Sequence, residues 1–226
     1  MAPTPLLSAF YFGSVEHYRL LAQHEQVIID IGEHYERQSY RTRTSIIGPN
    51  GKDDLVVRIA RRSGEKMPMR TVGLSYAETW PRQHLHAIRS AYGQTPWFIH
   101  YIDEIEAVLL KNYQRLVDLD IATMRLGMEW LGLRTEVVVS ESYVEAASGK
   151  QRAASSGIPS PLAAEDLPLD LRASFHPKKP LPPEITALPP YPQVFADRHG
   201  FAGRLSIIDL VCNCGPRAME HLRSHG

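Results

Sequence analysis

The sequence has no excess of either charge, because 25 Lys and Arg residues balance 25 Asp and Glu residues. A neutral chain lacks the basic surplus typical of proteins that bind duplex nucleic acid or an anionic membrane surface, so we expect neither partner. No apolar run approaches the roughly 20 residues that a membrane-spanning helix needs. The N-terminus lacks the basic residues and the long apolar stretch of a signal peptide, and we therefore expect a cytoplasmic protein.

Cysteine is scarce, and the only two, Cys212 and Cys214, stand two residues apart. Such close neighbours cannot form the disulfide framework of a small secreted protein. Cys214 precedes a predicted helix start at Pro216, and a thiol at a helix N-terminus has a lowered pKa. A cysteine nucleophile with His199 or His221 as its base is therefore one alternative, beside two buried, unreactive thiols.

Several familiar cofactor motifs are missing. The chain has no Gly-x-Gly-x-x-Gly, no P-loop and no Gly-x-Ser-x-Gly motif, so nothing indicates a dinucleotide or a nucleoside triphosphate. Ten histidines are present, but His84 and His86 fall on opposite sides of a predicted helix. His17 and His24 share a helix face, yet no acidic or cysteine partner follows at metal spacing. We predict no metal and no cofactor.

The length of 226 residues and the 43% hydrophobic content are typical of a single globular domain. Apolar runs at residues 4–13 and 26–31 predict two strands, and the helical spacing of residues 15–24 predicts a helix between them. The economical arrangement is a parallel pair of strands with a crossover helix. Ser14 is the expected N-cap of that helix.

The middle of the chain is predicted to be mainly helical. A Gly-Pro-Asn-Gly turn at residues 48–51 joins two β-type runs and predicts a hairpin. Residues 69–76 are a weaker strand candidate. Further periodic segments predict three helices and one strand, in this order: 80–93, 97–111, 117–132 and 135–142.

Residues 145–192 differ in composition from the rest, since they hold ten of the 17 prolines. We expect a long proline-rich loop without regular structure, which is either a lid, a binding or interface arm, or a mobile insert. Beyond it, Ser206 is a candidate N-cap and Pro216 a candidate helix start. The predicted class is α/β or α+β, with a mixed β-sheet, a helical middle and one domain over residues 1–226.

The stretch "EHYERQSYRTR", directly after the second strand, is dense in arginine. If it is extended, Arg37, Arg41 and Arg43 share one face, with Arg37 and Arg41 roughly 13 Å apart, and Gln38 and Tyr40 face the other side. Three guanidinium groups on one face suit a diphosphate or a carboxylate. The alternative is a solvated face whose arginines pair with neighbouring acids.

Asp209 is an ionisable residue between apolar neighbours in "LSIIDLVCNC". If it is buried it needs a partner, and the arginine stretch offers cations. A local cap or a salt bridge at the edge of the core is the alternative.

Four stretches together resemble the WbqC-like protein family of bacteria: "FYFGSVEHYRLL", "EHYERQSYRTRTSI" followed by "GPNG", "SAYGQTPWF" and "GFAGRLSIIDLVCNCGP". Thr42 stands where the family is expected to have Asn, and Cys214 where it tends to have Glu. The resemblance implies a role in surface polysaccharide or O-antigen biosynthesis, through modification of an amino sugar.

The leading hypothesis is a transferase that acts on a nucleotide-linked sugar. Its predicted substrate-binding residues are Arg37, Gln38, Tyr40, Arg41, Arg43 and Asn213. The arginines would hold the diphosphate or a donor carboxylate, and Asp209 would fix an arginine or act as a general base with a raised pKa. The predicted partner is an anionic small molecule, a nucleotide sugar or an acyl donor, and a homo-oligomer is one expected assembly. The alternative function is a non-catalytic binding or scaffold protein of the same pathway.

Overall fold

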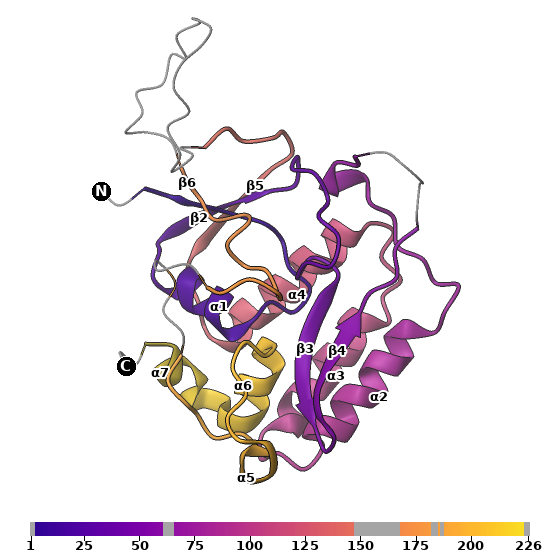
Figure 1. The fold of residues 1–226 in the computed structure, drawn as a ribbon, viewed down its shortest axis with the longest axis vertical. Helices are drawn as coiled ribbons and strands as arrows, with labels where there is room; N and C mark the ends of the chain where they lie inside the picture. The colour runs from indigo at the N-terminus through magenta and orange to yellow at the C-terminus, as the bar shows by residue number, and fades with distance from the viewer. Residues whose placement is uncertain (1–2, 61–65, 147–167, 182–184, 186–187, 224–226) are drawn as a thin grey trace, which may run out of the picture.

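The structure is a computed structural model that describes residues 3–60, 66–146, 168–181, 185 and 188–223. Its largest sheet has four parallel strands in the order β5-β2-β1-β6 (Figure 1). The strands are β1 Pro5–Leu7, β2 Gln26–Asp30, β5 Glu136–Ser140 and β6 Leu169–Asp170. A second sheet is the antiparallel hairpin of β3, Arg43–Gly48, and β4, Gly51–Val56.

The first β-α-β unit is built as the sequence predicts. Helix α1, Val15–Ala22, follows Ser14 and connects β1 to β2, which pair in parallel with Leu6 opposite Ile28. Strand β1 is shorter than expected, because the chain leaves the sheet after Leu7 and carries its aromatic residues into the core. The predicted parallel pair with a crossover helix is confirmed.

The hairpin is confirmed as well, with Gly48 opposite Gly51 at its turn and Gly51 at a φ of 105°. A positive φ of this size favours glycine, which explains the Gly-Pro-Asn-Gly sequence. The strand expected at residues 69–76 is wrong: Met69–Thr71 form a 3-10 turn, and beyond it the segment makes only isolated bridges.

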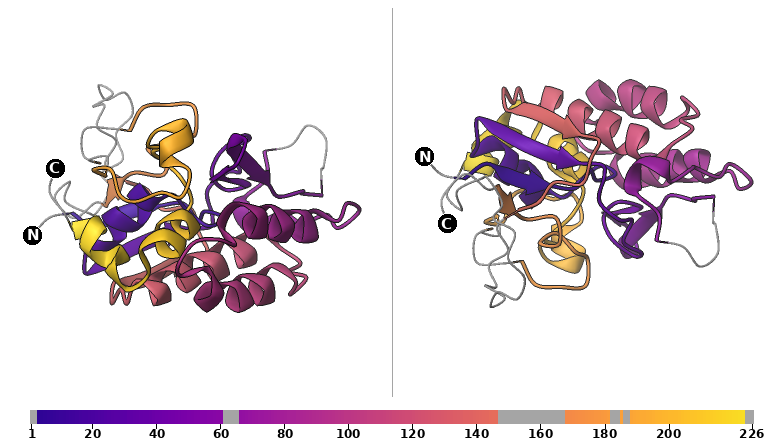
Figure 2. Two further views of the ribbon diagram at one scale, coloured as in Figure 1. Left: turned by 90° about the horizontal axis from the view of Figure 1, so that it is seen from below. Right: turned by 90° about the horizontal axis from the view of Figure 1, so that it is seen from above.

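The helical middle consists of α2 Trp80–Tyr92, α3 Phe98–Leu109 and α4 Leu116–Trp130. Both views of Figure 2 show these helices together on one side of the molecule, with the hairpin against them. The predicted helical patterns are confirmed. Among the described residues, no helix is both long enough and apolar enough to cross a membrane.

The C-terminal part contains α5 Ala196–His199, α6 Ile207–Cys214, a 3-10 turn at Gly215–Arg217 and α7 Ala218–Arg223. The side chain of Ser206 accepts a hydrogen bond from the Ile208 amide at 3.3 Å, as expected of an N-cap. One correction concerns the proline-rich segment, since β6 lies within it and pairs with β1. Residues 147–167 of that segment lie outside the described part of the chain.

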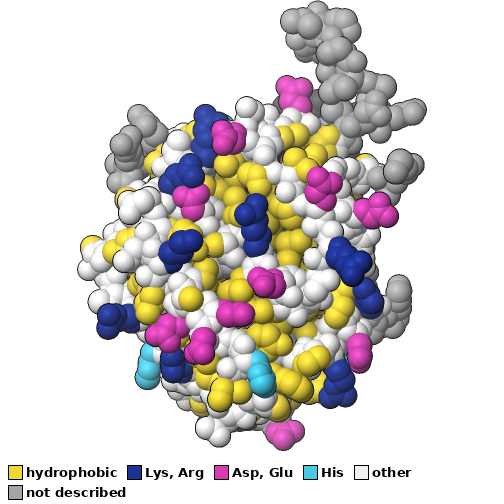
Figure 3. Space-filling view, turned by 180° about the vertical axis from the view of Figure 1, so that it is seen from behind, with side chains coloured by type: hydrophobic (Ala, Val, Ile, Leu, Met, Phe, Trp, Pro, Cys, Tyr) yellow, Lys and Arg dark blue, Asp and Glu magenta, His cyan; other side chains and the backbone are white. Residues whose placement is uncertain are grey.

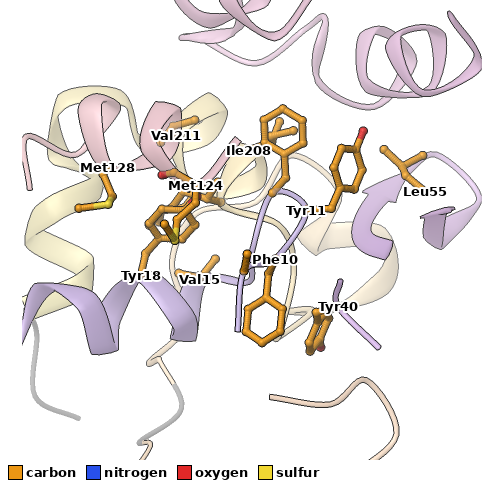
Figure 4. Packing of buried hydrophobic residues seen from close by; sticks show 14 of the residues in the cluster. Phe10, Tyr11, Val15, Tyr18, Tyr40, Leu55, Met124, Met128, Ile208 and Val211 are labelled. Carbon is orange, nitrogen blue, oxygen red and sulfur yellow. Dashed lines mark hydrogen bonds between the residues drawn. The ribbon is translucent and has the colours of Figure 1, made fainter. Parts of the chain in front are cut away.

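The core joins all of these parts. Figure 4 shows Phe10 and Tyr11 from the segment after β1, Tyr18 from α1, Met124 from α4 and Ile208 from α6 in one buried cluster. The predicted α/β class is confirmed, with the parallel and antiparallel pairings in two separate sheets.

The face opposite to that of Figure 1 carries a band of apolar side chains between interspersed basic and acidic ones (Figure 3). The described residues on this face form no basic patch. The search for an anion site therefore turns to the arginine stretch beside the hairpin.

Candidate functional site

The arginine stretch is a turn and not a strand. Residues 37–41 lie in turns or bends, and Gln38 adopts a positive φ of 56°. Strand β3 begins only at Arg43. The predicted common face of Arg37, Arg41 and Arg43 is therefore wrong, and the turn sends the three side chains to different places.

Arg41 points into the protein and is 2% exposed. Its guanidinium group donates to both carboxylate oxygens of Glu33, at 2.9 and 2.7 Å, and to the Ser8 hydroxyl at 2.6 Å. A further ion pair joins it to Glu36 at 3.3 Å. This geometry gives no support to a substrate-binding role for Arg41. It agrees with the alternative, in which the arginine pairs with neighbouring acidic residues.

A second buried arginine occupies the same edge of the parallel sheet. Arg172 follows β6 and forms ion pairs with Asp30, at the end of β2, and with Asp170. Its guanidinium group also stacks over the Tyr143 ring, 4.5 Å from the centroid. Ligands of open α/β sheets usually bind at the carboxyl ends of the strands. Here Arg41 and Arg172, with their own counter-charges, fill that edge.

A pocket of about 540 Å³ lies beside the open end of the hairpin. In Figure 1 this open end is the upper end of the hairpin. A backbone hydrogen bond from Tyr35 to the Met67 carbonyl, 2.9 Å long, brings two of its walls together, and a second bond from Val57 to the Thr42 carbonyl extends the hairpin beyond β3. The lining residues are Tyr35, Arg37, Gln38, Thr42, Arg43, Val56, Val57, Arg58, Ile59, Lys66 and Met67. Three predicted residues, Arg37, Gln38 and Arg43, thus share one pocket.

The lining is strongly cationic. Arg43 forms an ion pair with Asp54 at 3.0 Å, and Arg58 forms an exposed one with Glu78 at 3.0 Å. Arg37 and Lys66 have no ion-pair partner within the described residues. The Nε atom of Arg43 is buried and has no hydrogen-bond partner there either. Because the described lining residues include no acidic side chain, a phosphate or carboxylate is the group that the pocket suits.

Gln38 forms the rim of this pocket. Its side-chain oxygen accepts a hydrogen bond from the Lys178 ammonium group at 2.5 Å. Lys179, the next residue, lies 4.0 Å from the carboxylate of Glu36. The segment after β6 therefore crosses the turn next to the pocket and adds two more cations to its surroundings.

Tyr40 is buried away from the pocket. Its ring packs against Phe10, with centroids 6.1 Å apart, and the Arg204 guanidinium group lies 5.9 Å from its centroid. Burial raises the pKa of the Tyr40 hydroxyl, and the positive charge of Arg204 opposes that rise. The structure thus places Tyr40 beside Arg204 and outside the lining of the pocket that Arg37 and Arg43 share.

Asp209 lies fully buried in α6, as its apolar neighbours predict. Its carboxylate accepts hydrogen bonds from the Tyr191 hydroxyl at 2.6 Å and from the Gln193 amide at 2.9 Å. The prediction of an arginine partner for Asp209 is wrong, because the donors Tyr191 and Gln193 are neutral. Burial raises the pKa of Asp209 to about 6. A general base needs such a pKa, but it also needs access to substrate, and Asp209 is neither exposed nor part of the pocket lining.

Asn213 lies one helical turn after Asp209 and has a positioning role. Its amide group donates to the Asp209 carbonyl at 2.7 Å, and its side-chain oxygen accepts from the Val194 amide at 3.0 Å. Asn213 therefore fastens the chain at residues 191–194 to α6. The pocket lining does not include it.

The thiols give no support to a cysteine nucleophile. Cys212 and Cys214 are both buried, and burial raises the pKa of Cys214 to about 11. The pKa of Cys212 is raised by the same cause. Thiolates would be rare at neutral pH. The described residues also contain no group of three or more His, Cys, Asp or Glu side chains that could hold a metal.

Arg58 and Lys66 are pocket residues that the sequence argument missed. The hairpin could have indicated Arg58. Arg43 lies opposite Val56 at the open end of the hairpin, and Arg58 follows two residues after Val56, so both arginines lie at that end. No comparable signal pointed to Lys66, which reaches the pocket only through the Tyr35–Met67 contact.

Comparison with known families identifies one match. The model of the WbqC-like protein family matches residues 10–162, which is about two thirds of the chain and includes every residue that lines the pocket. Asp209 and Asn213 lie beyond the matched range. No curated protein and no solved structure matched the chain. Because the family model covers well over half of the sequence, the chain belongs to the WbqC-like protein family.

Proposed function

We propose that this protein is a cytoplasmic transferase that binds a nucleotide-linked amino sugar and modifies it during the biosynthesis of a bacterial surface polysaccharide such as an O-antigen. The observation that carries the proposal is the basic pocket, in which Arg37, Arg43, Arg58 and Lys66 surround about 540 Å³. Membership of the WbqC-like family supports the pathway.

The pocket combines the two features that a nucleotide sugar needs. Its cations supply the charge-assisted hydrogen bonds that a diphosphate requires. Tyr35 and the apolar side chains of Ile59 and Met67 offer a surface for a sugar ring or a base. In this proposal Arg37 and Arg43 hold the diphosphate, and Gln38 contacts a hydroxyl group at the rim.

A specific observation favours a second candidate, a binding protein without catalysis. The described residues that line the pocket include no Asp, Glu, His or Cys side chain. General acid–base catalysis usually depends on one of these groups, or on Lys or Tyr. Only Lys66 and Tyr35 could serve here, so a catalytic role requires one of them, or a group from a second ligand.

The test is isothermal titration calorimetry with UDP-, GDP- and dTDP-linked sugars on the wild-type protein and on Arg43→Ala. We expect one nucleotide sugar to bind, and we expect Arg43→Ala to weaken its binding at least tenfold, since a charged hydrogen bond contributes about 1.5–3 kcal/mol. Arg89→Ala is the matched control, because Arg89 makes an exposed ion pair with Glu106 on another face.

The outcome distinguishes the candidates. Product formation with an acyl or aminoacyl donor supports the transferase, whereas binding without turnover supports the binding protein. If Arg43→Ala unfolds the protein, and the remaining folded fraction still binds normally, Arg43 is structural and the pocket is not the site.

A further inference from the structure

A second polar cluster lies on the outer face of the hairpin, next to the basic pocket. We define the Glu16 cluster by six residues: Glu16, Tyr40, Arg43, Lys52, Asp54 and Arg204. They come from four separate segments of the chain. Residues 205–207 join these segments, because they form backbone hydrogen bonds with Gly13, Val15 and, through Ser206, with Ser45 of β3. Figure 1 shows the segment before α6 between α1 and the hairpin.

Three buried atoms of this cluster lack partners within the described residues: the Oε2 atom of Glu16 and the Nε atoms of Arg43 and Arg204. Glu16 itself is only 2% exposed. A buried polar atom without a partner carries a desolvation penalty, so such atoms are rare unless a ligand or an ordered water satisfies them. One buried carboxylate oxygen and two buried guanidinium nitrogens without partners in one cluster indicate a site for a ligand that carries both a donor and an acceptor.

The local backbone holds these groups in place. The Arg204 amide donates to the Oε1 atom of Glu16 at 3.1 Å, which leaves Oε2 free. The Arg204 guanidinium group donates to the carbonyls of Lys179, at 2.7 Å, and His176, which leaves its Nε free. Arg204 also has a φ of 61°, a region that non-glycine residues seldom adopt. Strain of this kind is concentrated at functional sites.

The cluster opens to solvent on the side of β4. Lys52 and Asp54 are exposed there, and the Lys52 ammonium group donates to the Gly203 carbonyl at 3.5 Å. The flexible Lys52 side chain can therefore move aside and then donate to an incoming anion.

We propose that the Glu16 cluster binds a zwitterionic α-amino acid, with its ammonium group on Glu16 and its carboxylate on Arg43, Lys52 and Arg204. A simple anion would meet the negative charge of Glu16, and a simple cation would meet the positive charges of Arg43 and Arg204. An α-amino acid supplies a cationic donor and an anionic acceptor within one compact group, which matches the charges on both sides.

The site goes beyond the proposed function, although Arg43 links the two. Arg43 lines the basic pocket, and its guanidinium group also bonds to Asp54 in the Glu16 cluster. An amino acid in the cluster would lie next to a sugar in the pocket. If the proposed transferase function holds, the amino acid is a second ligand beside the sugar.

The experiment is ligand-observed saturation-transfer NMR of the full chain with each of the twenty standard amino acids, followed by calorimetric titration of the one that binds. We expect one or a few to bind. Their N-acetyl derivative, which has no ammonium group, and their methyl ester, which has no carboxylate, should each bind at least tenfold more weakly. This comparison needs no variant and so does not depend on folding.

Glu16→Gln should weaken binding at least tenfold, because it removes the charge and keeps the acceptor for the Arg204 amide. Lys52→Met, at an exposed position, is the second variant and should weaken binding through the carboxylate. Asp118→Asn is the matched control, since Asp118 pairs with the exposed Arg115. Normal binding is expected for this control.

Three results would overturn the proposal: no amino acid binds, binding is unchanged in both Glu16→Gln and Lys52→Met, or the corresponding α-hydroxy acid binds as tightly as the amino acid. Titration of the same proteins with nucleotide sugars separates the two proposals. If an amino acid binds and no nucleotide sugar does, the transferase function fails and the amino acid site stands. The reverse result removes the site and leaves the basic pocket.

Discussion

His17 provides the sharpest test of the core, because it is a titratable ring in fully apolar surroundings. It lies in α1 and is 0% exposed. The rings of Phe10, Tyr18 and Phe175 surround it at centroid distances of 5.0, 5.5 and 5.4 Å. Neither ring nitrogen has a hydrogen-bond partner among the described residues. Burial therefore lowers the pKa of His17 from 6.5 to about 3.

The sign of the pH effect follows from proton binding in the two states. Between pH 6.5 and about 3 the unfolded chain binds a proton at His17 while the folded chain does not. Stability therefore falls as the pH decreases through this window, and the contribution is complete above pH 6.5. One pKa unit corresponds to 1.36 kcal/mol, so the loss at this residue is about 2 kcal/mol at pH 5 and approaches about 5 kcal/mol near pH 3.

The perturbation is His17→Phe, which keeps an aromatic ring and removes both nitrogens. Removing unsatisfied polar atoms stabilises the fold, while the larger ring costs roughly 1–3 kcal/mol if it overpacks. The ring has little room to shift, because it packs directly against the backbone at Gly13. A Cβ atom built on Gly13 would lie only 2.6 Å from His17 Nδ1. These two effects do not depend on pH, so they cancel when one protein is compared with itself at two pH values.

The assay is urea unfolding of both proteins at pH 8, 7, 6 and 5. We expect the wild type to lose about 2 kcal/mol more than His17→Phe between pH 8 and pH 5. His84, whose pKa burial lowers to about 4, contributes equally to both proteins and drops out of the difference. Equal losses in the two proteins, within about 0.5 kcal/mol, would show that His17 is solvated or partnered and would refute the reasoning.

Three further predictions concern buried groups. Burial raises the pKa of Asp120 well above 3.8. The free energy of unfolding should therefore fall with rising pH between 3.8 and that pKa, by about 1.4 kcal/mol per pH unit. Urea titrations of Asp120→Asn should lack this slope. Arg41→Ala should cost about 3–5 kcal/mol in denaturant melts, because Glu33 would remain buried and unpaired, whereas Arg41→Ala/Glu33→Gln should recover part of that loss. Gly127→Ala should lower the melting temperature by several degrees, since the new Cβ would lie 2.3 Å from the Tyr18 hydroxyl, and an unchanged melting temperature would contradict this packing.

Local signals predicted most of the secondary structure. Ser206 caps α6 through its side chain and the Gly-Pro-Asn-Gly turn marks the hairpin, because these residues act on their own backbone or on the next few residues. Ser14 stands at the start of α1 as expected, although its side chain makes no capping hydrogen bond. The extended conformation predicted for the arginine stretch was wrong for the opposite reason. Its turn is held by Arg41, whose partner Ser8 lies 33 residues away. No local pattern encodes such a contact.

In the candidate site, too, a local sequence pattern indicates some residues, while others are placed by contacts between distant segments. The density of arginine drew attention to Arg37, Gln38 and Arg43, which line one pocket although they do not share a strand face. Asp209 is buried, and so it needs a partner, as the sequence argument stated for that case. Its partner Tyr191, however, belongs to the proline-rich segment, which lacks any periodicity that could place it beside α6. Residues from unpatterned segments become predictable only when the fold is known.

The position of the pocket follows from how the sheet edge is filled. In an open parallel sheet, the carboxyl ends of the strands present free backbone groups and are the usual place for a ligand. Here Arg172 pairs with Asp30, and Arg41 pairs with Glu33, which also lies just beyond the end of β2. Because buried, paired charges are costly to separate, a ligand cannot displace them cheaply. The proposed anion site therefore lies at the hairpin, where Arg37 and Lys66 have no counter-charge among the described residues. Neutralising the basic pocket while leaving the two buried arginines intact should abolish anion binding with little effect on stability.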